Sequence, residues 1–151
     1  MIINGKSLYN LRPLYPMEEK KRTHEYSGTS YGLTECGYDI RLDQDVWLYP
    51  GHRFVLASSI EMFDMPLHLM ARIMNKSSWA RMGVDVSRST NAEPGWKGYL
   101  TLEITYSRLR PLKLPMGCGI AQVIFEQIYE PAQYKGKYQN QKKGPQNAIF
   151  N

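Results

Sequence analysis

The sequence predicts a mainly β domain of the sandwich or barrel type, and three observations support this prediction. Apolar and polar residues alternate with period two in several short segments, which is typical of half-buried strands. Glycine and proline residues separate these segments at short intervals. Helical periodicity is convincing only over residues 77–82, where Ser77 is the expected N-cap. The length of 151 residues suits a single domain.

The first predicted strands cover residues 39–42 and 45–49, where the alternation is regular. The Pro50-Gly51 pair ends the second strand with a turn, and residues 53–57 begin a new strand directly afterwards. We therefore expect a hairpin or a corner over residues 48–56.

The later strands are expected at residues 67–74, 98–106 and 118–128. The strand at 98–106 has the clearest alternation, because Leu100, Leu102, Ile104 and Tyr106 share one face. Residues from 138 onwards are polar and are expected to be loosely held until residues 149–150.

Composition limits the class of protein further. No apolar run approaches the ~20 residues of a membrane-spanning helix, and the first residues lack the order of a secretory signal. Cys36 and Cys118 lie far apart in sequence, which suits a reducing cytosol better than a disulfide framework. We expect a small cytoplasmic protein without a membrane-spanning segment.

The net charge of +5 indicates an anionic partner without identifying it. A purely basic stretch near the end contains Lys135, Lys137, Lys142 and Lys143. Composition alone favours a flexible tail there, although phosphate or single-stranded nucleic acid would also fit.

Glu103 is the first candidate for chemistry, because alternation places it on the face opposite the apolar residues of its strand. It is either a solvated carboxylate or a general base held rigidly in a cleft. Glu93 lies at a Pro-Gly turn ten residues upstream, beside Trp96. The sequence therefore allows a polar pocket with two carboxylates and an aromatic wall.

The segment of residues 75–81 is the second candidate. A helical turn starting there would gather free backbone N–H groups, the hydroxyls of Ser77 and Ser78, and the cations Lys76 and Arg81. It is either an anion-binding site or a capped turn with solvated cations. The segment is not a Walker loop.

The sequence lacks the motifs of two common classes of hydrolytic enzyme. The three histidines show no zinc-ligand spacing, and no G-x-S-x-G motif accompanies a serine. We therefore expect any hydrolysis to use a water that a carboxylate activates.

An ordered set of blocks over roughly residues 33–145 resembles the dCTP deaminase branch of the trimeric dUTPase superfamily. Each block alone is weak, but their order is specific. The blocks are Gly37-Tyr38-Asp39-Ile40-Arg41-Leu42, Leu48-Tyr49-Pro50-Gly51, Val55-Leu56-Ala57-Ser58, Lys76-Ser77-Ser78-Trp79-Ala80-Arg81-Met82-Gly83, Glu93-Pro94-Gly95-Trp96-Lys97-Gly98, Leu102-Glu103, Gly119-Ile120-Ala121-Gln122-Val123-Ile124-Phe125 and Gly136-Lys137-Tyr138-Gln139-Asn140-Gln141.

The resemblance implies a distorted jelly-roll of the dUTPase-like type, with residues 1–151 as one domain, assembled as a homotrimer with active sites at subunit interfaces. It implies deamination of dCTP to dUTP, which would supply thymidylate synthesis. The partner that it implies is a nucleotide substrate, with no nucleic acid and no membrane. On the family pattern Glu103 activates the water that attacks C4 of cytosine, and Ser77 and Arg81 lie near the reacting base.

The resemblance also implies a set of substrate-binding residues, with residues 134–151 as a basic tail that closes over the site. They are Lys76, Ser78, Glu93, Trp96, Gln122, Tyr134, Lys137 and Gln141. Mg²⁺ is expected on the triphosphate oxygens rather than in a protein cage, and zinc is not expected.

Three alternative functions stay open on the sequence. Glu103 and Glu93 favour deamination, since members that only hydrolyse dUTP usually have an apolar residue and an Asp at these positions. A bifunctional enzyme that converts dCTP to dUMP, a dUTP diphosphatase and a non-enzymatic nucleotide sensor are the alternatives. Lys76 stands where many members carry Arg, and Asn91 lies in the hairpin where some deaminases carry Arg. Both departures are compatible with a monophosphate or modified cytosine as substrate.

Overall fold

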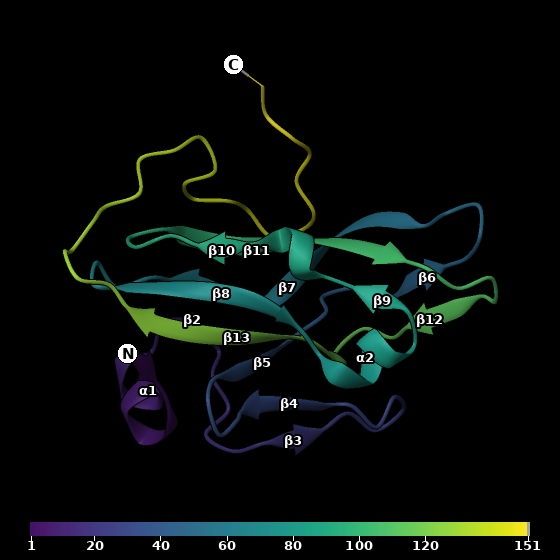
Figure 1. Ribbon diagram of the computed structural model, residues 1–151, viewed down its shortest axis with the longest axis horizontal. Helices are drawn as coiled ribbons and strands as arrows, with labels where there is room; N and C mark the ends of the chain where they lie inside the picture. The colour runs from purple at the N-terminus through teal and green to yellow at the C-terminus, as the bar shows by residue number, and fades with distance from the viewer. Residues whose placement is uncertain (151) are drawn as a thin grey trace.

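Two curled β layers dominate the computed structural model, which describes residues 1–150 (Figure 1). The larger sheet has seven strands in the order β10-β8-β13-β5-β4-β3, with β1 paired to β13. Its strands are β1 (Ile2–Ile3), β3 (Arg22–Thr23), β4 (Ser30–Leu33), β5 (Tyr38–Arg41), β8 (Leu69–Asn75), β10 (Asn91–Ala92) and β13 (Gly119–Gln127).

The second sheet has four strands in the order β2-β7-β11-β9, and a separate pair joins β12 to β6. These strands are β2 (Leu14–Tyr15), β7 (Phe54–Asp64), β9 (Val84–Asp85), β11 (Lys97–Tyr106), β6 (Val46–Leu48) and β12 (Leu112–Leu114). The helical elements are short: α1 (Gly5–Leu11), α2 (Ser77–Arg81) and the 3₁₀ turn η1 (Ser87–Ser89). The predicted mainly β sandwich with a short helix near Ser77–Met82 is confirmed.

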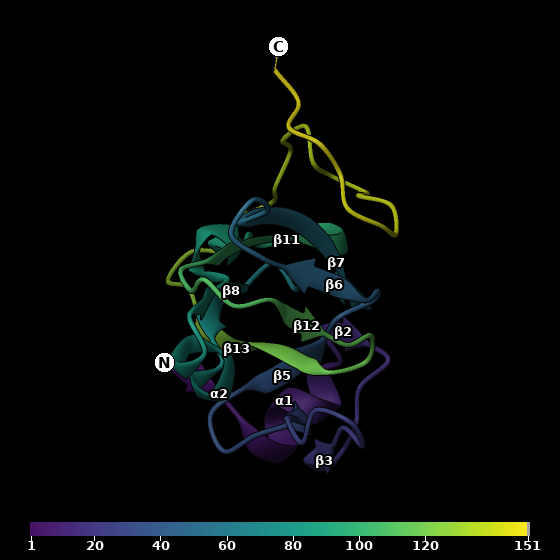
Figure 2. The same ribbon diagram turned by 90° about the vertical axis from the view of Figure 1, so that its right-hand side faces the viewer.

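The core lies between the two layers, as Figure 2 shows with β7 and β11 above β13 and β5. Along β11 every second residue is buried, and Leu102 and Ile104 are fully enclosed. Val123 and Phe125 of β13 are fully buried as well. The predicted apolar face of β11 is therefore confirmed, and its other face carries Thr101 and Glu103.

Residues 48–56 form a corner rather than a hairpin, which settles the two alternatives. The His52 N–H donates to the Tyr49 carbonyl at 2.8 Å across the Pro50-Gly51 turn. The strands on either side then join different partners, because β6 pairs with β12 and β7 pairs with β11 and β2.

The helices differ from the prediction in two respects. The N-cap of α2 is Lys76, without a side-chain capping bond, so the prediction that Ser77 caps this helix is wrong. Helix α1 was not predicted; its one buried residue is Leu8. In the described part of the chain, residues 1–150, no helix has the length and apolar character needed to cross a bilayer.

Candidate active site

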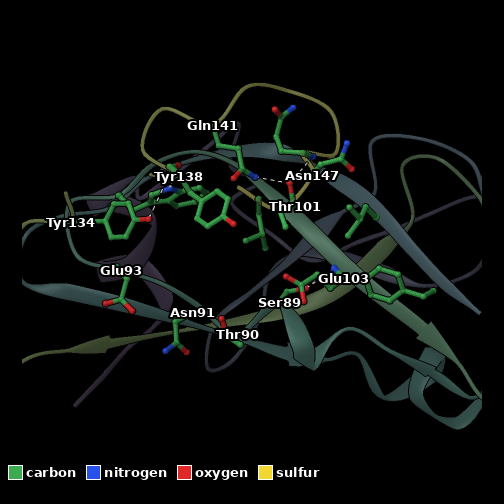
Figure 3. A pocket seen from close by; sticks show the side chains of 16 residues that line it. Ser89, Thr90, Asn91, Glu93, Thr101, Glu103, Tyr134, Tyr138, Gln141 and Asn147 are labelled. Atoms are coloured by element: carbon green, nitrogen blue, oxygen red, sulfur yellow. Dashed lines mark hydrogen bonds between the residues drawn. The ribbon is translucent and has the colours of Figure 1, made fainter. Parts of the chain in front are cut away.

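A cavity of about 440 Å³ opens on the polar face of β11 (Figure 3). Its walls are formed by β11, the start of β7, the segment from η1 through β10 to the following turn, and residues 134–148, here called the C-terminal segment. Its lining residues are Phe54, Leu56, Ser89, Thr90, Asn91, Glu93, Trp96, Leu100, Thr101, Glu103, Tyr134, Tyr138, Gln141, Gln146, Asn147 and Ala148.

Glu103 occupies one end of this cavity, on the strand at the centre of the site. Its backbone lies opposite Leu56 of β7, and its own N–H donates to the Ser89 hydroxyl oxygen at 2.9 Å. The side chain is half-buried. A carboxylate on a paired strand is held in position and still reaches the cavity.

Glu93 and Trp96 belong to the turn between β10 and β11. The Trp96 N–H donates to the Glu93 carbonyl at 3.0 Å, and Gly95 between them has a φ of 72°, which glycine adopts without strain. Trp96 is almost fully buried and packs against Phe63 with 5.6 Å between ring centroids. Glu93 is exposed at the opposite end of the cavity from Glu103, as Figure 3 shows. The structure thus brings both carboxylates and the aromatic wall into one pocket.

The C-terminal segment forms the upper wall of the cavity, with Tyr134, Tyr138, Gln141 and Asn147 facing it (Figure 3). The expectation that residues from 138 onwards are loosely held is wrong at Gln141. Its carbonyl accepts the Tyr99 N–H at 3.0 Å, and its side-chain amide donates to the Tyr99 carbonyl at 2.9 Å and to the Thr101 hydroxyl at 2.6 Å. These bonds align the segment parallel to β11.

Further contacts attach this segment to the turn before β11. The Trp96 indole N–H donates to the Tyr138 carbonyl at 2.7 Å. The Gln139 carboxamide accepts the Lys97 N–H at 2.7 Å and donates to the Gly95 carbonyl at 2.9 Å. Lys137 does not line the cavity; its ammonium nitrogen lies 5.7 Å from the ring centroid of Tyr138.

The remaining predicted residues gather around α2, outside the cavity lining. Ser77, Ser78 and Arg81 are exposed on this helix. Gln122 lies on β13 opposite Asp39 of β5, and its amide is 3.4 Å from the Thr34 hydroxyl.

Lys76 is already engaged within the chain, because its ammonium donates to Asp39 at 2.5 Å and to the Ser30 hydroxyl at 2.9 Å. Both charged side chains of this pair are largely buried. The role of Lys76 toward phosphate therefore stays a prediction, with Asp39 as a competing partner.

The charged residues that line the cavity are all acidic. Among its described lining residues are two carboxylates and no Lys, Arg or His. Such a pocket suits a neutral heterocycle with polar edges, and it repels phosphate. A charged nucleotide can bind here only if its phosphates extend toward cations outside this lining.

No three His, Cys, Asp or Glu side chains among residues 1–150 are arranged to hold a metal ion. The carboxylates Glu93 and Glu103 sit apart at the two ends of the cavity (Figure 3).

Sequence reasoning did not assign site roles to Ser89, Thr90, Thr101, Tyr138, Gln146 or Asn147, which also line the cavity. Thr101 could have been found, since alternation places it on the same face as Glu103. Ser89 could not, because its approach to Glu103 depends on the tertiary path of η1.

Comparison with known proteins places the chain in a family. A family model described as dCTP deaminase-like matches residues 36–128. The dCTP deaminase of Campylobacter lari is 36% identical over an alignment that covers 74% of this chain and 77% of that protein. The dCTP deaminase of Methylacidiphilum infernorum is 32% identical, with 87% and 88% covered. The chain belongs to the dCTP deaminase-like family.

Solved structures agree on the fold. The 2'-deoxycytidine 5'-triphosphate deaminase of Agrobacterium tumefaciens superposes with a TM-score of 0.56 at 18% identity, covering 82% of this chain and 47% of that chain. The EIAV dUTPase superposes with a TM-score of 0.58 at 16% identity, covering 82% and 96%. The protein therefore has the dUTPase-like fold.

Proposed function

We propose that this protein deaminates dCTP hydrolytically to dUTP and ammonia, with Glu103 as the group that activates water. The observation that supports this most directly is the position of Glu103, a carboxylate fixed on β11 and facing a cavity of about 440 Å³. Deaminases that share the family, at up to 36% identity, support dCTP as the substrate.

Hydrolytic deamination needs a group that first accepts a proton from water and then donates a proton to the leaving amine. The Glu103 carboxylate accepts a proton from the water that attacks C4 of cytosine, and the protonated carboxyl then delivers it to the departing amine. The C4–N bond breaks, the proton of the hydroxyl left on C4 moves to N3, and dCTP plus water gives dUTP plus ammonia. The mechanism assigns no step to a protein-held metal.

The triphosphate requires cations that the cavity lining does not contain. We propose that the chain forms a homotrimer in which Ser77, Ser78 and Arg81 of one subunit face the Glu103 cavity of another. The exposure of these three side chains supports this arrangement. Mg²⁺ would reach the site on the triphosphate oxygens and their waters, and would offset phosphate charge there.

A second candidate is a bifunctional enzyme that also cleaves dUTP to dUMP and pyrophosphate, in which Glu93 would take the place of the Asp that dUTP-hydrolysing members carry. Its carboxylate lies at the other end of the same cavity (Figure 3). A second carboxylate in that place provides a base for water attack on a phosphate.

A product assay tests both candidates. The purified protein is incubated with Mg²⁺ and either dCTP or dUTP, nucleotides are resolved by ion exchange, and ammonia is measured in parallel. Ammonia with dUTP supports the deaminase, whereas ammonia with dUMP and pyrophosphate supports the bifunctional enzyme. Hydrolysis of dUTP with dCTP unchanged would contradict the role of Glu103.

Glu103→Gln tests the proton transfer directly. The amide keeps the size of the side chain but cannot accept the proton, so we expect turnover to fall at least ~100-fold while nucleotide binding persists. Binding is measured by calorimetry with dCTP and turnover by ammonia release. Wild-type turnover in this variant would remove Glu103 from the mechanism.

A further inference from the structure

The outer edge of β11 around Glu103 is not completed by a strand. Strand β9 pairs with β11 only at Thr105 and Tyr106. Nearer the start of β11, the Gln141 carbonyl accepts a hydrogen bond from the Tyr99 N–H. The Glu103 N–H lies between these two partners, and it donates to the hydroxyl oxygen of Ser89 at 2.9 Å. At this edge of β11 the Ser89 side chain therefore takes the place of a neighbouring strand as the hydrogen-bond partner of the Glu103 backbone.

Ser89 is well fixed in this role. Only 7% of its surface is exposed, and its own N–H donates to the Val86 carbonyl at 3.0 Å. Two hydrogen bonds connect the η1 turn to strand β8. The Val86 N–H donates to the Asn75 side chain at 2.7 Å, and the Ile73 N–H donates to the Thr90 carbonyl at 2.8 Å.

The backbone directly after Ser89 is unusual. Thr90 has a φ of 58° and a ψ of −104°, a conformation that a β-branched residue rarely adopts. This residue lets the chain turn from η1 into β10 while Ser89 stays against β11. Because Ser89 and Thr90 both line the cavity, the strained turn belongs to the site itself (Figure 3).

We propose that Ser89 is a positioning residue, which fixes the backbone of Glu103 and thereby aims its carboxylate at the bound base. This inference rests on the proposed function of Glu103. Proton transfer depends steeply on the placement of the base, so loosening the backbone of Glu103 slows chemistry more than it weakens binding.

The backbone bond is tested first in the free protein, by amide hydrogen exchange of Glu103 in Ser89→Ala. We expect the Glu103 amide to exchange at least ~10-fold faster, while the Ile104 amide, within the β11–β7 ladder, is unchanged. Ser87→Ala is the matched control, since the Ser87 hydroxyl lies on the same turn but bonds to Asp85. Equal exchange in wild type and Ser89→Ala would overturn the proposal.

Kinetics then separate positioning from a general structural effect. In Ser89→Ala we expect kcat to fall about 10-fold with KM within about twofold, and Ser89→Thr to restore kcat because it keeps the hydroxyl. Ser89→Cys keeps a side chain of similar size, but its sulfur is a weak acceptor, so kcat should fall in the same direction. If Ser89→Ala does not fold, Ser89→Cys and Ser89→Thr decide the question.

Failure of the proposed function and failure of the positioning role of Ser89 give different experimental results. A wild-type protein that does not release ammonia from dCTP contradicts the proposed function, whereas the exchange experiment still reports the Ser89 bond. Wild-type turnover combined with unchanged kcat in Ser89→Ala and Ser89→Cys overturns the positioning role alone.

Discussion

The pair of Lys76 and Asp39 links α2 to the larger sheet. Both side chains are largely buried, with 11% and 5% of their side-chain surfaces exposed, and the Ser30 hydroxyl completes the contact. A buried charge that loses its partner keeps its desolvation cost, so removing one member of such a pair is expensive. The family block that contains Asp39 therefore has a structural task in this chain.

Asp39→Asn should lower the free energy of unfolding by about 3 kcal/mol, because it leaves the Lys76 ammonium buried without a counter-charge. Urea denaturation measures the change. The matched control is Asp64→Asn, which breaks the exposed Lys97–Asp64 pair, and it should cost no more than about 0.5 kcal/mol. Equal losses in the two variants would show that the burial of the Lys76 pair is energetically unimportant.

Asp85 gives the stability a dependence on pH. The Ser87 hydroxyl, and then the Ser87 backbone N–H, donate to this carboxylate and lower its pKa below 3.8. A lowered pKa stabilises the fold above the unfolded value and loses that contribution as the pH falls through the folded value. Asp85→Asn cannot titrate, so it should lose less stability than the wild type between pH 6 and pH 3 in urea titrations. Parallel pH curves for the two proteins would contradict this assignment.

At the scale of elements, the docking of the C-terminal segment on β11 depends on Gly98. This glycine has a φ of 151°, and a Cβ added there would lie 2.7 Å from the Gln141 nitrogen. The three nearest atoms are the backbone nitrogen, the carbonyl oxygen and the Cβ of Gln141, so none of them can move away without a shift of the backbone. The absence of a side chain is thus what lets the segment lie along the strand.

Gly98→Ala should therefore release this segment, and limited trypsin digestion should cleave at Lys142 and Lys143 faster than in the wild type. Gly51→Ala is the control, because no atom lies within 4 Å of a Cβ at that position. If the segment closes over the substrate, KM for dCTP rises in Gly98→Ala only. An unchanged digestion rate would show that the segment does not depend on this close approach.

The sequence was sufficient for the strands whose pattern is local and insufficient for features that depend on distant partners. Alternation located β11 and the face of Glu103, since burial on one side of a strand selects residues with period two. Helix α1 has seven residues, begins with Gly5 and buries only Leu8, so its sequence carries little helical periodicity. The bonds of Ser89 and Gln141 join side chains to backbone across 14 and 42 positions, and no local pattern encodes them.

At the scale of the whole molecule, the chain separates its candidate carboxylates from the candidate residues on α2. The cavity holds Glu93 and Glu103, whereas Ser77, Ser78 and Arg81 are exposed on α2 outside the lining. A nucleotide with a triphosphate needs both sets at once. Closed rotational symmetry can bring different surfaces of identical chains together at each interface, which would unite the two sets three times in a trimer.

Mixing two inactive variants tests this arrangement. Glu103→Gln and Arg81→Ala should each abolish turnover alone, yet trimers reassembled from an equal mixture should regain about one quarter of wild-type activity. In this arrangement each site takes Glu103 from one subunit and Arg81 from its neighbour. A site is intact when an Arg81→Ala chain supplies Glu103 and a Glu103→Gln chain supplies Arg81. Mixed samples are unfolded and refolded together, and ammonia release is compared with samples refolded separately and then combined. If Glu103 and Arg81 act within one chain, every site keeps a defect and mixing restores nothing.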